Sequence, residues 1–250
     1  MSASSVAHLH TVLHTALAQA EAWGVVPRNV ARLVRPPRSP RREMTALTPE
    51  QVGGFLNAVR GDRLEALYVV AVTTGMRQGE LLALRWKDID LDARTVRVRT
   101  TLNATKSGIE FAEPKSARSR RQISLTITAV AALRRHRGAQ LEERLRVGTS
   151  WPEYDLVFAS EVGGPLDGSN ILRRSFYPLL RSAGLPRVRF HDLRHSAATL
   201  MLSRGVPLKI VSEILGHSQI SITADTYMHV TAGMQREAAA ALDAVLGGRS

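Results

Sequence analysis

Apolar residues recur every three or four positions from Val6 to Leu17, which is the spacing of one face of an α-helix. This pattern predicts a helix over residues 6–24, and a shorter helix is predicted around residues 27–34. The pattern stops in residues 35–43, RPPRSPRRE, where three prolines interrupt four arginines. We therefore expect a short helical segment at the start of the chain, followed by an extended basic linker.

A second set of elements begins at LTPEQVGGFLNAVR. Thr48 suits the N-cap of a helix, Pro49 suits its first turn, and Gln51 completes a capping box. The apolar run in residues 64–75 predicts another helix, and a further helix is expected after Met76, through RQGELLALRW. These signals place the start of a separate, larger domain at the end of the linker.

Polar and apolar residues alternate in residues 94–101 and again in residues 120–126, which predicts two strands. A long basic hairpin containing EPKSARSRR lies between them. From Ile127 onward the pattern is mostly helical, and the short apolar run DLVFAS fits either a strand or a helix. The expected fold class is α+β, mostly helical, with a small sheet.

Charge changes this picture more than any other bulk property. The 250 residues carry a formal net charge of +12 and contain no cysteine. The absence of cysteine excludes disulfides and thiolate metal sites and favours a reducing cytoplasm.

No apolar run approaches the roughly 18 residues of a membrane span, and the N-terminus lacks a signal-peptide pattern. A basic excess of this size favours a nucleic-acid partner, and because only 5% of residues are aromatic, phosphate contacts with a duplex fit better than base stacking.

Many of the basic residues are arginines, whose planar guanidinium suits phosphate oxygens. We expect the linker to lie along DNA phosphates, although a solvated loop is the alternative. The hairpin is expected to contribute in the same way. The candidate DNA-binding residues are Arg35, Arg38, Arg41 and Arg42 in the linker and Arg118, Arg120 and Arg121 in the hairpin.

Four separate segments combine residues that suit phosphate chemistry. TTGMRQGELLALRWKDID places Arg77 at a break between helices with Glu80 one turn later, and EPKSARSRR contains Lys115. FHDLRHSAATLML sets a histidine and an arginine three residues apart, hence on one helix face. EILGHSQISITADTYMHV places a histidine after a helix that ends at a glycine, with a tyrosine ten residues later. The residues in the last two segments are His191, Arg194, His217 and Tyr227.

Each segment also has an ordinary structural explanation. Arg77 and Glu80 could form a surface ion pair of little energetic value. His191 and His195 have the four-residue spacing of a metal pair, but neither a HExxH glutamate nor a cysteine accompanies them. Residues 206–223 resemble a helix-turn-helix, which a regulator would use to contact bases. Lys115 could be a solvated lysine, and a lone tyrosine is usually a packing residue.

Taken together, the order, types and spacing of these residues resemble the tyrosine recombinases of the phage integrase family. The resemblance covers residues 44 to about 235 and rests on TGMRQGELLALRWKDID, PK, HDLRHSAATL, LGHS and the tyrosine about ten residues beyond. It implies a catalytic domain with a small antiparallel sheet and strand cleavage through a 3′-phosphotyrosine. The basic linker also resembles the one that precedes the catalytic domain in these integrases.

The resemblance also implies a role for each residue. Two arginines stabilise the charge on the phosphate without a metal, and the tyrosine is the nucleophile. The two arginines are Arg77 and Arg194, and the tyrosine is Tyr227. The resemblance makes His191 the base, Lys115 the general acid and His217 the histidine that binds the phosphate. Glu80 is the glutamate that orients the arginine or histidine.

The family also implies a division into parts. Residues 1–34 correspond to the end of a helical, SAM-like core-binding domain, residues 35–43 to the linker and residues 44–250 to the catalytic domain. Such integrases usually begin with an arm-site-binding domain and a complete core-binding domain, so the chain is expected to be N-terminally short and to bind its site weakly. Residues 231–246 are expected to form a helix that docks on a neighbouring protomer, with packing on its own domain as the alternative.

The implied partner is double-stranded DNA at attachment or recombination sites, held by a homotetramer in a synaptic complex without membrane contact. The implied reaction uses no metal, ATP or other cofactor, and the implied location is the cytoplasm, in association with the nucleoid. Two other functions are open to the same residues: a helix-turn-helix regulator that never cuts DNA, and a relaxing topoisomerase of the type IB class.

Overall fold

The computed structural model describes residues 1–37, 46–105, 108–112, 120–217, 219–221, 223–224, 227 and 243. The chain divides into two compact units, Met1–Met44 and Thr45–Ser250. None of the described helices combines the length and the apolar character needed to cross a membrane.

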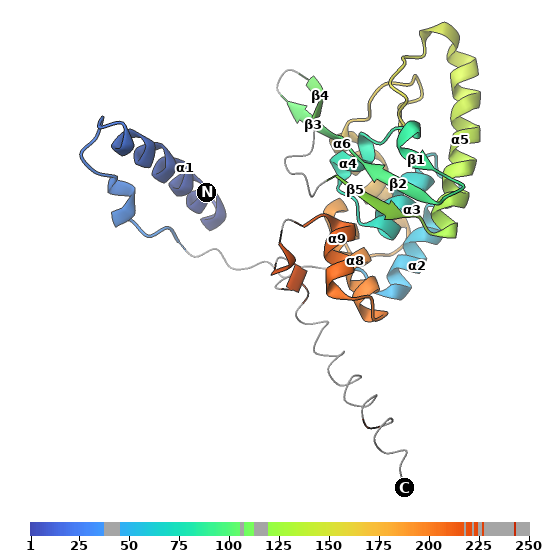
Figure 1. Ribbon diagram of the computed structural model, residues 1–250. Coiled ribbons are helices and arrows are strands. Elements are labelled where there is room, and N and C mark those ends of the chain that lie inside the picture. Colours follow the sequence, from blue (N-terminus) through green and yellow to red (C-terminus); the bar gives the residue numbers. More distant parts are fainter. Residues whose placement is uncertain are drawn as a thin grey trace. The chain divides into compact units, whose positions relative to one another are not determined.

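The first unit contains α1 (Ala3–Ala22), followed by a 3₁₀ turn, η1 (Val30–Leu33) (Figure 1). The predicted long helix is confirmed, and the second predicted helix is this single turn. Asn29 joins the two elements, because its side-chain amide donates to the His14 carbonyl and its oxygen accepts from the Ala31 N–H. None of the side chains of α1 is buried.

The second unit opens as its capping signals predict. Thr48 caps α2 (Pro49–Ala58), and Gln51 returns a hydrogen bond to the Thr48 N–H at 3.0 Å. The next helix, α3 (Glu65–Thr74), has almost all of its residues buried and packs against both α5 and α8. It therefore forms the centre of the unit.

The helix predicted after Met76 is shorter than expected. Helix α4 (Gln78–Leu82) stops early because the following backbone bonds a distant segment instead. The Val157 N–H donates to the Leu84 carbonyl and the Trp86 N–H to the Asp155 carbonyl. The DLVFAS run is thus neither a helix nor a strand, but a buried segment held through isolated bridges. A short 3₁₀ turn, η2 (Trp86–Asp88), follows α4.

The described strands form two small antiparallel sheets, which Figure 1 shows. One sheet has the order β1-β2-β5, and the other is the hairpin of β3 and β4. Within the first sheet Val96 faces Ile123 and Arg97 faces Gln122, so one surface is buried and the other exposed. The strands are β1 (Ile89–Asp90), β2 (Thr95–Val98), β3 (Thr101–Thr105), β4 (Gly108–Ala112) and β5 (Arg121–Ser124).

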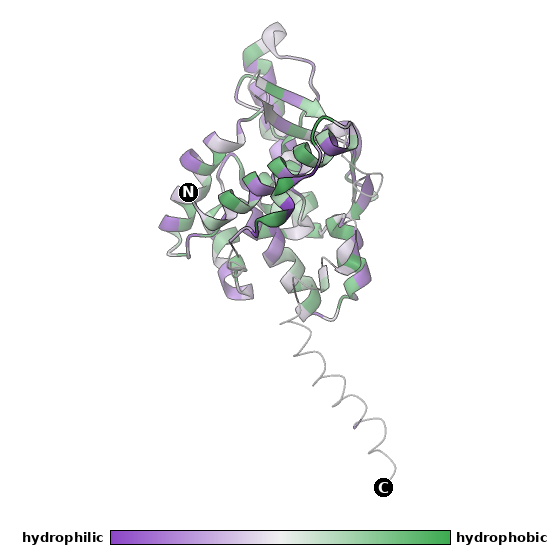
Figure 2. Cartoon of the chain, turned by 90° about the vertical axis from the view of Figure 1, so that its left-hand side faces the viewer, coloured by the Kyte–Doolittle hydropathy of each residue, from purple (hydrophilic) through white to green (hydrophobic). Residues whose placement is uncertain are grey.

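Helices complete the unit, which confirms the α+β, mostly helical fold class. Their green and purple stretches alternate along the ribbon in Figure 2, as expected of helices with one buried face. A cluster of aromatic rings formed by Phe55, Tyr68, Phe176 and Phe190 ties α2 and α3 to the later helices. These later elements are α5 (Ile127–Val147), η4 (Gly148–Ser150), α6 (Gly168–Ile171), the π-helical turn η5 (Leu172–Phe176), α7 (Tyr177–Ser182), α8 (Phe190–Ser203) and α9 (Leu208–Leu215).

Candidate active site

Arg194 lies at the meeting point of three helices. It projects from α8, and its side chain is only 3% exposed. Nη1 donates to the Gly75 carbonyl at 2.8 Å and Nη2 donates to the Leu215 carbonyl at 2.6 Å. These carbonyls close α3 and α9, where backbone oxygens lack helical partners and carry the negative end of the helix dipole. The helix ends therefore hold the guanidinium in place before any ligand arrives.

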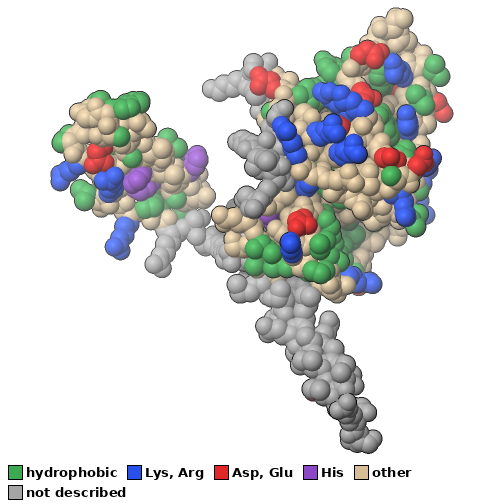
Figure 3. All heavy atoms as spheres, viewed as in Figure 1, with side chains coloured by type: hydrophobic (Ala, Val, Ile, Leu, Met, Phe, Trp, Pro, Cys, Tyr) green, Lys and Arg blue, Asp and Glu red, His purple; other side chains and the backbone are tan. Residues whose placement is uncertain are grey.

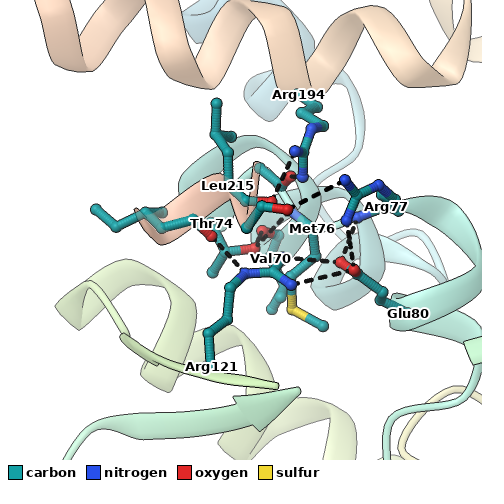
Figure 4. Close-up of polar contacts among 11 residues, drawn as sticks. Val70, Thr74, Met76, Arg77, Glu80, Arg121, Arg194 and Leu215 are labelled. Atoms are coloured by element: carbon teal, nitrogen blue, oxygen red, sulfur yellow. Dashed lines mark hydrogen bonds and ion pairs between the residues drawn. The ribbon is translucent and has the colours of Figure 1, made fainter. Parts of the chain in front are cut away.

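Two further arginines bind the same end of α9. Arg121 donates from Nε to the Ile214 carbonyl at 2.6 Å, and Arg77 donates from Nη2 to the Gly216 carbonyl at 3.4 Å. Together with Arg194, they occupy three consecutive carbonyls, as Figure 4 shows in part. The C-terminus of α9 thus gathers cations from three segments that are far apart in the sequence.

Two glycines make this close approach possible. Gly75 and Gly216 end α3 and α9 with φ of 63° and 66°, a conformation that favours glycine. A Cβ on Gly75 would lie 2.7 Å from Cδ2 of Leu215, and one on Gly216 would lie 2.9 Å from Nη1 of Arg121. The TG and LGHS stretches therefore need glycine for both backbone conformation and space.

Glu80 is the anionic centre of the cluster and is 3% exposed. Its carboxylate accepts from Arg77 Nη1 at 2.9 Å and the Arg77 backbone N–H at 2.9 Å, and from Arg121 at 2.8 and 3.1 Å. Burial raises the pKa of Glu80, but the hydrogen bonds and charges of Arg121 and Arg77 outweigh it and hold the pKa below its ordinary value. Three arginines against one carboxylate leave an excess positive charge that suits an anion.

Arg121, one of the predicted DNA-binding residues, lies largely inside the protein. Its side chain is only 7% exposed and pairs with Glu80 inside the protein. The cause is strand alternation: Arg121 shares the inward face of β5 with Ile123, whereas Arg120 and Gln122 face outward. In this structure Arg121 positions Glu80, and its contact with DNA phosphate stays a prediction.

Burial lowers the pKa of Arg194 to about 9, and the nearby charge of Arg77 acts in the same direction. The group still carries its charge at neutral pH. Burial, followed by the charges of Arg194 and Arg77, lowers the pKa of His217 to about 4. Partial burial and Arg194 likewise lower the pKa of His191. Both imidazoles are therefore neutral at pH 7 and able to accept a hydrogen bond or a proton.

The two histidines differ in their surroundings. His191 is exposed and lies one turn before Arg194 on α8, the face that the sequence predicts. His217 follows Gly216, and its Nδ1 is 2.7 Å from the Thr223 hydroxyl. That contact fixes the imidazole ring beside the end of α9.

Tyr227 is a buried packing residue whose hydroxyl also has a hydrogen-bond partner. Its ring is 1% exposed and packs in a small apolar cluster with Ala198, Leu202, Val211 and Leu215. Its hydroxyl is hydrogen-bonded to Nδ1 of His195 at 2.7 Å. Burial raises the pKa of Tyr227 to about 12, against the opposing influence of Arg194.

From the sequence, His195 stands out only through its metal-pair spacing from His191. The two rings pack edge to face with centroids 4.9 Å apart. Within the described residues, no group of three or more histidine or acidic side chains is arranged to hold a metal ion. No local sequence signal links His195 to Tyr227, because 32 positions separate them.

The remaining predicted residues divide into two groups. Arg35 is exposed in the first unit, and Arg120 is exposed just before β5. The others fall outside the described residues: Lys115, Arg38, Arg41, Arg42, Arg118 and the helix expected over residues 231–246.

The outer face of the β1-β2-β5 sheet also presents two arginines that were not among the predicted DNA-binding residues, Arg97 and Arg99. Together with Arg120, which was predicted, they line a surface hollow of about 520 Å³. Figure 3 shows basic side chains gathered over this part of the larger unit. Alternation along TVRVR was the available signal, since it places Arg97 and Arg99 on one face of a strand.

Comparisons with known proteins agree with this geometry. Residues 45–234 match the model of the phage integrase family. A tyrosine recombinase XerC-like protein of Caldanaerobacter subterraneus subsp. tengcongensis is 39% identical over 200 residues, covering 75% of this chain and 51% of the relative. An integrase of Streptomyces ambofaciens is 35% identical over 242 residues, covering 91% of this chain and 60% of the relative. The chain thus spans about half to three fifths of the length of these relatives.

Solved structures give the same fold. The crystal structure of XerA recombinase matches with a TM-score of 0.62 and 26% identity, covering 83% of this chain and 70% of the other. The Tn1549 transposon integrase, solved in complex with a circular intermediate DNA, matches with a TM-score of 0.76 over 94% of this chain and 80% of the other. At 21% identity, that likeness concerns the fold alone. On the strength of the family match across most of the larger unit, the chain belongs to the phage integrase family of tyrosine recombinases.

Proposed function

We propose that this protein breaks and rejoins double-stranded DNA through a covalent 3′-phosphotyrosine on Tyr227, without metal or ATP. The observation that carries the proposal is the convergence of three arginines on the end of α9, close to the buried hydroxyl-bearing side chain. A phosphodiester is an anion, and attack on it increases the charge on its non-bridging oxygens. Fixed guanidinium groups supply stabilisation for that charge without reorganising during the reaction.

In this mechanism the scissile phosphate binds Arg77 and Arg194. Both guanidinium groups have N–H bonds beyond those already used to hold carbonyls or Glu80, so each can donate to a phosphate oxygen. His217, neutral and fixed by Thr223, adds a further hydrogen bond to the phosphate. Glu80 keeps the Arg77 side chain in place.

The chemical step exchanges one ester for another. The Tyr227 oxygen bonds to phosphorus, the bond from phosphorus to the 5′-oxygen breaks, and Lys115 supplies the proton that the leaving oxygen requires. The family role of proton acceptor falls on His191. Because the phosphotyrosine conserves the energy of the broken bond, a DNA 5′-hydroxyl can attack it and reseal a strand without ATP.

The DNA partner and the assembly are part of the same proposal. The Tn1549 integrase was solved with a circular intermediate DNA, and we propose a comparable duplex ligand for this chain. The net charge of +12 and the exposed arginines of the sheet support it. We also propose four copies on paired sites, with residues 231–246 bridging neighbours. Deleting residues 233–250 should then impair synapsis more than binding to a single site.

Covalent trapping tests the reaction. The protein is incubated with nicked suicide duplexes tiled across the ends of the mobile element that encodes it, and adducts that survive denaturation are counted. Tyr227→Phe should form none while binding DNA as the parent does, and the matched variant Tyr154→Phe, at an exposed tyrosine, should react normally. Adducts formed by Tyr227→Phe would refute the nucleophile. Salt-sensitive binding without any adduct would favour the non-cutting regulator instead.

Arg77→Ala is the cleaner test of phosphate stabilisation. The Arg77 side chain is 41% exposed, whereas Arg194 is buried as part of the fold. Loss of one donor of this type slows a reaction by about 10²–10³-fold. We expect that loss in the rate of adduct formation, measured on protein whose folding is checked by circular dichroism because Arg77 also pairs with Glu80.

A further inference from the structure

The hydroxyl of Tyr227 has a specific partner, and that partner is not the histidine that carries the family role. Nδ1 of His195 lies 2.7 Å from the Tyr227 oxygen. The rings of His195 and Tyr227 are tilted against each other with centroids 5.9 Å apart. The His191 ring instead packs edge to face against the His195 ring, with centroids 4.9 Å apart. The phenol therefore meets an imidazole nitrogen directly.

The position of His195 is set by the elements that build the site. It follows Arg194 on α8, whose N-terminus is fixed because Asp192 accepts the Arg189 backbone N–H at 2.7 Å. One turn later the Ser196 hydroxyl accepts the Leu47 N–H at 2.9 Å. With α8 held at both points, the fold fixes the backbone that carries His195.

We propose that His195 orients the Tyr227 hydroxyl and takes its proton during strand cleavage. The proposal rests on the proposed function and assigns to His195 the step given above to His191. As the Tyr227 oxygen bonds to phosphorus, its proton passes to Nδ1 of His195, and the 5′-oxygen leaves with a proton from Lys115. On resealing, the 5′-hydroxyl gives up its proton to Lys115, and His195 returns its proton to the phenol oxygen.

The electrostatics of the free site are consistent with this assignment. Burial, then the charges of His191, Arg194 and Arg189, lower the pKa of His195 to about 4, while Asp192 acts in the opposite direction. The ring is therefore neutral at pH 7 and can accept a hydrogen bond. Among the described residues, His217 beside α9 and Tyr227 itself also interact with His195. A phosphate bound to Arg77 and Arg194 offsets their positive charge and raises the basicity of His195.

The test compares His195→Gln and His195→Phe in single-turnover adduct formation on suicide duplexes. Glutamine keeps a hydrogen-bonding group but cannot take a proton, and phenylalanine removes both functions. Loss of general base catalysis costs about 10²–10⁴-fold, so both variants should be slowed by at least about 10²-fold with unchanged DNA affinity. His8→Gln, at an exposed histidine of the first unit, is the matched control and should react at the parent rate.

A second substrate separates the base from the acid. When the 5′-oxygen is replaced by sulfur, the leaving thiolate needs no proton, so Lys115→Ala should recover its rate. The His195 variants should stay slow, because the phenol still has to lose its proton. With this substrate the parent rate should fall as the solution is acidified through the pKa of the base. The pH–rate profile of His195→Gln should lack this fall at acidic pH.

The outcomes are distinct. Parent-like rates in His195→Gln, or its rescue by the sulfur substrate, would overturn the role of His195 and leave the proposed function standing. Absence of any adduct with the parent protein would overturn both. If the variants fail to fold, two other measurements test the role of His195. The parent rate on the sulfur substrate must fall at acidic pH. The ¹⁵N chemical shift of His195 Nδ1 must differ between the parent and Tyr227→Phe if the hydrogen bond exists.

Discussion

Arg121→Met should destabilise the larger unit severely, because it leaves a buried carboxylate short of its partners. Methionine keeps an unbranched side chain of similar length but removes the charge and every N–H group. Glu80 would lose two hydrogen bonds of 2.8 and 3.1 Å, and the Ile214 carbonyl would lose one of 2.6 Å. Removing one partner of a buried ion pair costs about 3–5 kcal/mol. Because Arg77 remains as a partner of Glu80, we expect a loss near 3 kcal/mol, the lower end of that range.

Urea denaturation followed by circular dichroism measures this loss. The matched control is Arg97→Met, the same chemical change at an exposed position of the neighbouring strand, which should cost less than about 0.5 kcal/mol. A loss below about 1 kcal/mol for Arg121→Met, close to that of the control, would show that the ion pair does not hold the site together.

The pair also predicts a pH dependence with a definite sign. The pKa of Glu80 in the folded protein is below its ordinary value of 4.5. Its ionised form therefore adds stability above about pH 4.5, and this contribution is lost as the pH falls through the lower, folded-state pKa. Glu80→Gln should lack that part of the acid destabilisation. In combination with Arg121→Met it should cost less than the sum of the two single changes, by about 0.5–3 kcal/mol.

Three further predictions concern the rest of the site. Gly75→Ala should lower the free energy of unfolding by at least about 1 kcal/mol, since φ is 63° and the added methyl group meets α9; an unchanged urea midpoint would contradict this. The pKa of His217 is lowered from 6.5 to about 4, so the unfolded chain binds the extra proton and stability should fall as the pH drops from about 6.5 to 4. His217→Asn should make that decline shallower in denaturation series. Arg97→Ala and Arg99→Ala should each reduce the slope of log affinity against log salt by about 0.9 if they contact duplex phosphates, and unchanged slopes would remove them from the interface.

Patterns formed by residues close together in the sequence predicted the structure reliably. Thr48 and Gln51 are three residues apart, so their capping box could be predicted from side-chain chemistry alone. The end of α4 could not be predicted, because the backbone carbonyl of Leu84 finds its partner at Val157, 73 positions later in the sequence. Propensity favoured a longer helix, but these non-local hydrogen bonds ended it.

The candidate active site likewise combines features that nearby residues predict with features that depend on contacts between distant segments. The shared face of His191 and Arg194 follows from helical spacing. The inward direction of Arg121 also follows from the sequence, since Arg121 alternates with Ile123 and Leu125 along one strand. The bond between His195 and Tyr227 depends on how the segment beyond α9 returns to α8, and no pattern in the sequence contains that information.

The three arginines at the end of α9 have a consequence for how copies of such a gene decay. Arg194 and Arg121 hold helix ends and a buried carboxylate together, so selection for a folded, DNA-binding protein would retain them even after strand cleavage had ceased to matter. Selection for folding alone would not retain the hydroxyl of Tyr227, because phenylalanine would fill the same apolar cluster. Degenerate descendants should therefore lose the tyrosine hydroxyl first, and an intact set of arginines is weaker evidence of an active recombinase than the tyrosine is.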